Sequence, residues 1–126
     1  MDIAANLTDI HRQIDATCRD CGRSPDEVRL VAVAKTKPIE LVEAAMAAGQ
    51  TLIGESYVQE LVAKTDQITT PAEWHFIGHL QSNKAKYLVG RTTLIHSVDR
   101  LSLAKEIDRQ WGKAGEIADI LVQVNL

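Results

Sequence analysis

Five short apolar segments recur along the chain and restrict what it can fold into. They begin near residues 29, 51, 73, 93 and 118, at intervals of 20 to 25 residues, and apolar residues at helical spacing lie between them. This alternation predicts repeated βα units and a parallel sheet. Two α/β architectures share the pattern. One is a complete five-stranded doubly wound domain of the flavodoxin type, and the other is the first half of a (β/α)8 barrel of the TIM type, which typically needs about 250 residues.

Length and composition indicate one globular domain over residues 1–126. With 45% hydrophobic and 25% charged residues the chain has enough apolar side chains for one core. The net charge of −3 gives no electrostatic reason to expect nucleic acid or an anionic membrane, so we expect a small-molecule partner or another protein. The sequence has no apolar run of membrane-spanning length and no signal-peptide pattern at its N-terminus. We therefore expect a cytoplasmic protein.

The pair Cys18 and Cys21 has the C-x-x-C spacing found in redox pairs and zinc sites. Both cysteines continue the apolar stripe of the first predicted helix, and a zinc site needs four ligands. His75 and His79 are four residues apart, but a strand followed by a loop does not place them on one face as a helix would. We therefore expect packing roles for the cysteines and predict no metal site.

The stretch LVAVAKTKP, residues 30–38, combines an unbroken apolar strand with a lysine at its end. Such a run is typical of a strand that is covered on both sides, so we expect Lys35 to be poorly solvated. Desolvation would lower the pKa of the amine and make it a nucleophile toward carbonyls, as in Schiff-base chemistry. The alternative is a structural lysine whose stem lies along the strand while its ammonium group reaches water.

Polar residues gather where the predicted strands run into helices, which is the working edge of both candidate architectures. These corners place Lys35, Ser56, His79 and Asn83 at one edge of the sheet. Helix capping alone would also explain Ser56 and Asn83. His75 lies in the middle of a strand, where a hydrogen-bonded core histidine is the simpler interpretation.

Taken together, these corners resemble the pyridoxal 5′-phosphate (PLP) homeostasis proteins, a family of PLP-binding proteins. The resemblance runs from about residue 3 to the last residue and rests on AVAKTKP, IGESYVQE, WHFIGHLQSNK, HSVDRLSLAKEID and ILVQVNL. It implies a PLP barrel of fold type III, similar to the N-terminal domain of alanine racemases, with PLP bound as an aldimine to Lys35. It also implies a PLP carrier or regulator without established turnover. A racemase-like enzyme acting on amino acids is the alternative. We expect Lys35, Ser56 and His79 to bind the cofactor.

Two departures from the family pattern affect these expectations. Ser56 stands where the family usually has asparagine, so a carboxamide contact to the cofactor is in doubt. Family members exceed 200 residues, and the resemblance places the phosphate-binding loops and an arginine opposite the pyridine nitrogen beyond residue 126. We therefore expect a fragment that ends after the fifth strand of the barrel. Its two open sheet edges predict self-association.

Overall fold

The computed structural model describes all residues from Met1 to Leu126 and contains the five predicted strands. The helices are α1 (Ile3–Asp20), α2 (Ile39–Ala47), α3 (Val58–Gln67) and α4 (Leu101–Lys113), with short 3₁₀ helices η1 (Pro25–Glu27) and η2 (Ser82–Leu88). The strands are β1 (Ala32–Val33), β2 (Leu52–Glu55), β3 (Glu73–Phe76), β4 (Leu94–Val98) and β5 (Ile120–Val122). No helix is long and apolar enough to cross a membrane.

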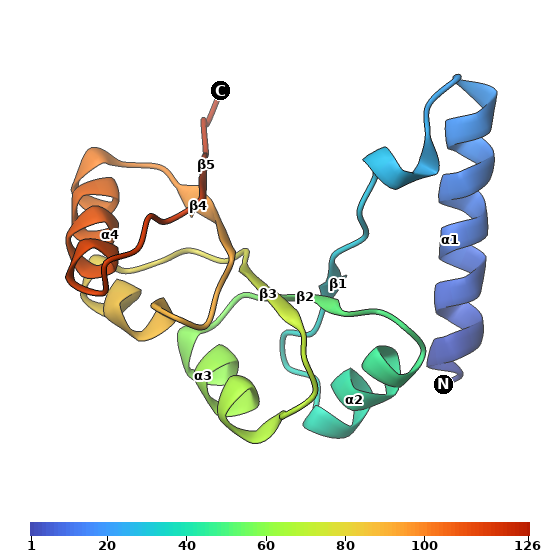
Figure 1. The fold of residues 1–126 in the computed structure, drawn as a ribbon, viewed down its shortest axis with the longest axis horizontal. Coiled ribbons are helices and arrows are strands. Elements are labelled where there is room, and N and C mark those ends of the chain that lie inside the picture. The colour runs from blue at the N-terminus through green and yellow to red at the C-terminus, as the bar shows by residue number, and fades with distance from the viewer.

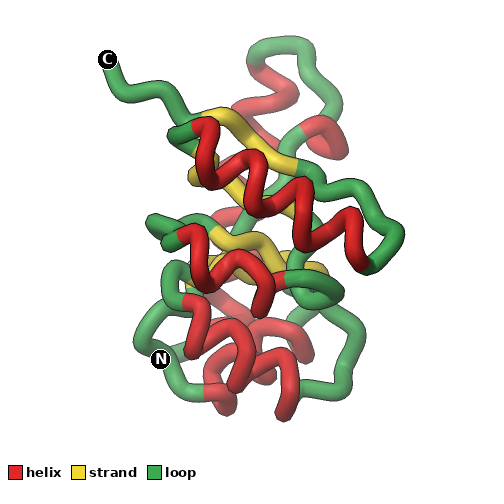
Figure 2. Tube along the Cα trace, turned by 90° about the vertical axis from the view of Figure 1, so that its left-hand side faces the viewer, coloured by secondary structure: helices red, strands yellow, loops and turns green.

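The sheet has the order β1-β2-β3-β4-β5, and every neighbouring pair is parallel. A flavodoxin-type domain would have the order 2-1-3-4-5 and helices on both faces. Here α2, α3 and α4 all lie on the outer side of a curved sheet (Figure 1). A view turned by 90° shows one helix crossing in front of the strands and others lying below them (Figure 2). This is the arrangement of half a (β/α)8 barrel, and it excludes the doubly wound alternative.

The hydrophobic core lies between the outer face of the sheet and the helices. Alternate strand residues point into it, as the pleat requires. The strands contribute Ile53, Phe76 and Ile95, and the helices contribute Leu61 and Leu103; each of these side chains is at most 1% exposed. The strand-helix units therefore stay together by burying apolar surface on one side of the sheet only.

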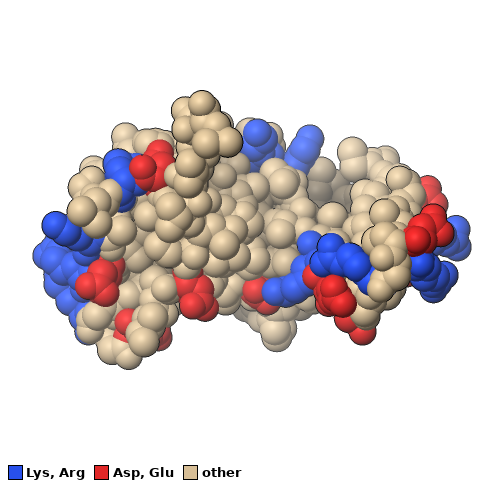
Figure 3. Space-filling model, turned by 90° about the horizontal axis from the view of Figure 1, so that it is seen from above, with Lys and Arg blue, Asp and Glu red and all other residues tan.

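The two outer strands leave apolar side chains in solvent. Val33 on β1 is 53% exposed and Val122 on β5 is 72% exposed. The expectation that the first strand is covered on both sides is wrong, because Ala32 packs against the core on one face of β1 while Val33 on the opposite face is exposed. Seen from above, the middle of the molecule shows a broad surface with few charged side chains, and most charges lie toward its ends and margins (Figure 3).

Some local details also differ from the sequence predictions. The helix expected to hold Leu80 to Leu88 is the 3₁₀ helix η2. Asp99 does not cap α4, because its carboxylate pairs with the neighbouring Arg100 guanidinium at 2.8 Å instead. Cys18 is buried, as the packing interpretation requires, whereas Cys21 is exposed.

Candidate functional site

Lys35 follows β1 directly, at the edge of the sheet where the parallel strands end. Its predecessor Ala34 still belongs to the sheet, since the Ala34 N–H donates to the Gly54 carbonyl at 2.9 Å. The Lys35 side chain is exposed, so the expected desolvation is not found. The amine is accessible to a ligand that approaches this edge.

Ser56 and His79 line one cavity between the loops that follow β2 and β3. The cavity has a volume of about 330 Å³, and its lining also includes Gln59, Gln81 and Lys84. All five side chains can donate a hydrogen bond, and the lining contains no carboxylate. Lys35 is not among the lining residues, so the structure brings Ser56 and His79 together but does not place Lys35 in the same cavity.

The two loops that form this cavity touch through their backbones. A Cβ atom added to Gly78 would lie 2.1 Å from the Ser56 carbonyl oxygen. Only glycine therefore fits at this position, and its presence keeps Ser56 and His79 close together. The Ser97 hydroxyl donates to the Gly78 carbonyl at 2.5 Å, which holds the loop after β3 against β4.

Helix capping does not explain Ser56 in the structure. Helix α3 begins at Val58, its cap residue is Tyr57, and no side chain caps its first turn. Gln59, Gln81 and Lys84 line the cavity but were not predicted as site residues. Gln81 and Lys84 lie in the same strand-to-helix corner as His79, so their position in the sequence could have predicted them. Gln59 lies within α3, where no sequence signal marks it.

A buried ion pair lies beneath the loop that carries Lys35. The Lys64 ammonium is 2.6 Å from one Glu55 carboxyl oxygen and 3.2 Å from Glu60, and the Glu55 side chain is fully buried. Burial raises the pKa of Glu55 despite the opposing effect of Lys64. Burial would also raise the pKa of Glu60, but hydrogen bonds from the Thr36 N–H and Lys64 outweigh it and lower that pKa. Lys64 therefore contacts two carboxyl groups whose pKa values shift in opposite directions.

A second polar chain crosses the inner face of the sheet. Arg29 contacts both Glu73 carboxylate oxygens, at 2.8 and 3.2 Å, and His75 links Glu73 to His96 through its two ring nitrogens. Hydrogen bonds from Arg29 and His75 lower the pKa of Glu73 to about 2. Burial and the nearby His75 lower the pKa of His96. His75 is a hydrogen-bonded core histidine, as expected.

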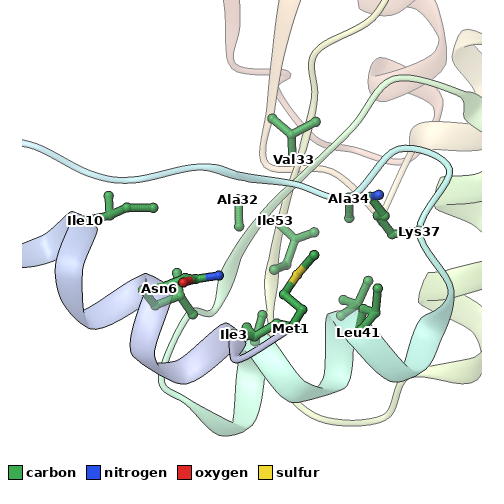
Figure 4. Close-up of a pocket in the computed structure, with 13 residues that line it drawn as sticks. Met1, Ile3, Asn6, Ile10, Ala32, Val33, Ala34, Lys37, Leu41 and Ile53 are labelled. Carbon is green, nitrogen blue, oxygen red and sulfur yellow. The ribbon is translucent and has the colours of Figure 1, made fainter.

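Another cavity is mostly apolar and lies on the outer side of β1. It has a volume of about 300 Å³ and lies between α1, β1 and α2, where Ile3, Leu41 and Ile53 point toward one another (Figure 4). Eleven of its 13 lining residues are hydrophobic. Its two polar lining residues are Asn6 and Lys37. The structure also contains no group of three His, Cys, Asp or Glu side chains suited to a metal ion.

Comparison with known proteins gives long and consistent matches. The chain is 41% identical to the pyridoxal phosphate homeostasis protein of Escherichia coli K12, over 99% of this chain and 55% of that protein. It is 37% identical to the protein of the same name in Aquifex aeolicus, over 100% of this chain and 56% of that protein. No family model matches the chain.

A solved structure agrees with these sequence matches. PipY of Synechococcus elongatus, determined with PLP bound, superposes with a TM-score of 0.85 at 37% identity and covers 98% of this chain and 55% of PipY. The chain spans about half the length of the curated relatives that it matches. The resemblance predicted from the sequence is therefore confirmed: nearly the whole of this chain is homologous to about half the length of the pyridoxal phosphate homeostasis proteins.

Proposed function

We propose that this chain takes part in PLP homeostasis by holding PLP as a Schiff base on Lys35. The observation that carries the proposal is the position of Lys35, an exposed primary amine at the end of the first strand of a sheet that superposes on PLP-bound PipY. Condensation of the Lys35 amine with the PLP aldehyde would release one molecule of water. PLP supplies the aldehyde, and the chain supplies the amine and its placement.

The polar groups at the same edge suit an anionic cofactor. Ser56 and His79 offer a hydroxyl and an imidazole, and Lys84 adds a cation, with no carboxylate in the lining to repel a phosphate. We propose that Ser56 and His79 contact the cofactor. The main phosphate contacts would come from the part of the family's length that this chain does not span. Cytoplasmic location and a single folding domain over residues 1–126 remain predictions.

Spectroscopic titration tests this function. We expect PLP added to the purified chain to give the absorbance band of a protein-bound Schiff base, and Lys35→Ala to abolish it. Lys105→Ala is the matched control, because Lys105 is an exposed lysine on α4. Loss of one hydrogen bond in Ser56→Ala or His79→Ala should weaken PLP binding up to about tenfold. An equal signal from wild type and Lys35→Ala would contradict the proposal.

A second experiment separates a carrier from the racemase-like alternative. A racemase must remove the α-hydrogen of an amino acid, so incubation in deuterated solvent would exchange that hydrogen. We expect no exchange above that of free PLP. The names of the relatives favour the carrier, since they are pyridoxal phosphate homeostasis proteins. Tyr57 lines the same cavity as Ser56 and His79, whereas Tyr87 does not.

A further inference from the structure

The turn after β1 has a backbone conformation that its sequence does not favour. The Ala34 carbonyl accepts a hydrogen bond from the Lys37 N–H at 3.1 Å, which closes a four-residue turn around Lys35 and Thr36. Thr36, the third residue, has a φ of 62°. A positive φ at this position of a turn usually requires glycine or asparagine, and a β-branched residue is a clear outlier there. Contacts from outside the turn must therefore stabilise it.

Two residues of α3 supply these contacts. The Glu60 carboxylate accepts from the Thr36 N–H at 2.8 and 3.2 Å, and the Lys64 ammonium donates to the Ala34 carbonyl at 2.8 Å. Glu60 and Lys64 are four residues apart and so lie on one face of the helix. Lys64 also donates to Glu55 and Glu60, so all three of its N–H donors are used. Charge-assisted bonds of this kind are roughly twice as strong as neutral ones.

The positions of these bonds matter because they lie on either side of Lys35. The Ala34 carbonyl belongs to the peptide plane before the Lys35 Cα, and the Thr36 N–H belongs to the plane after it. Each peptide unit is planar, so holding both planes fixes the φ and ψ angles of Lys35. The direction of its Cα–Cβ bond is then set, and only the side-chain rotamers remain free.

We propose that Glu60 and Lys64 are positioning residues that hold the backbone on both sides of Lys35 and so aim its side chain at the ligand. The proposal rests on the function proposed for Lys35 in PLP binding. It assigns no contact between PLP and either residue. This role accounts for the buried Lys64, whose side chain is 6% exposed and donates a hydrogen bond to the Ala34 backbone carbonyl.

Hydrogen exchange of the Thr36 amide tests, in the absence of PLP, whether Glu60 stabilises the turn. Glu60 is the residue to change, since its side chain is 29% exposed and its replacement leaves the buried Lys64–Glu55 pair in place. In Glu60→Met the Thr36 amide should exchange about tenfold faster, because it loses a charge-assisted bond. Glu60→Gln keeps an acceptor oxygen and should show a smaller change. Glu43→Gln on α2 is the control and should match wild type.

The rate of tryptic cleavage in the turn is a second test of whether Glu60 stabilises it. The Lys35–Thr36 bond lies in the turn, and the proline at position 38 blocks cleavage after Lys37. We expect Glu60→Met to be cut after Lys35 several times faster than wild type, and Glu43→Gln to be cut at the wild-type rate. Unchanged exchange at Thr36 and unchanged cleavage in Glu60→Met would overturn the inference.

PLP titration of the same variants then tests the functional part. We expect Glu60→Met to bind PLP about tenfold more weakly than wild type, and Glu60→Gln to recover part of the loss. If PLP affinity is unchanged although the turn is released, the positioning role is wrong. If wild type binds no PLP at all, the proposed function fails, and the exchange and cleavage results still decide whether Glu60 holds the turn.

Discussion

Gly78 is the residue on which the shape of the candidate cavity depends most directly. A Cβ atom here would meet the Ser56 backbone at 2.1 Å, and two backbones that belong to adjacent strand ends have little room to move apart. We expect Gly78→Ala to lower the free energy of unfolding by more than about 2 kcal/mol. Gly112→Ala on α4 is the control, since nothing lies within 4 Å of its added Cβ. It should instead stabilise the protein by about 0.5 kcal/mol. Urea unfolding of both variants measures the difference, and equal effects would contradict the close approach at Gly78.

Glu73 makes the stability of the chain depend on pH. Its pKa is about 2 in the folded protein and is lower than its ordinary value of 4.5, so folding favours the carboxylate. The stabilisation is fully present above the ordinary pKa and is lost as the pH falls from about 4.5 toward 2. We expect Glu73→Gln to flatten the fall in stability over this range, as measured by urea midpoints at a series of pH values. Parallel curves for wild type and Glu73→Gln would show that the pair with Arg29 contributes nothing.

At the scale of the elements, α4 shows how the helices hold the sheet. Its apolar face buries Ile107, which is 2% exposed, whereas Leu101 at the start of the helix is 69% exposed. Ile107→Ala should cost about 2–5 kcal/mol of unfolding free energy because it leaves a cavity against the sheet. Leu101→Ala should change stability by less than about 0.5 kcal/mol. Thermal unfolding of both variants tests this, and similar losses would mean that α4 does not pack on the sheet as described.

The elements themselves could be predicted from sequence because hydrophobic periodicity records which side chains are buried against neighbours. The five strands and the candidate edge with Lys35, Ser56 and His79 follow from that periodicity. The prediction that Asp99 caps α4 was wrong because the neighbouring Arg100 binds the Asp99 carboxylate instead. The pair Arg29–Glu73 joins residues 44 positions apart, and the contact of Glu60 with Thr36 spans 24. No local pattern predicts such pairs, since they depend on the order of the strands.

At the scale of the whole molecule, the open sheet determines behaviour in solution. Both edge strands expose apolar side chains, and the surface between them carries few charges (Figure 3). We expect concentration-dependent self-association through these edges. Combining Val33→Lys with Val122→Lys should shift sedimentation equilibrium toward the monomer. Leu101 is also exposed and apolar but lies away from the sheet edges, so Leu101→Lys should leave the association unchanged. A wild-type chain that stays monomeric at high concentration would contradict this prediction.

The proposed function depends on the amine of Lys35, one of the seven lysines of the chain. The most direct test is to mix the 126-residue chain with PLP, reduce the mixture with borohydride, and locate the modified lysine by peptide mass mapping, with Lys35→Ala treated in parallel. We expect one dominant adduct on Lys35 that is missing from the variant. Labelling spread over the surface lysines, to the same extent in both proteins, would contradict it.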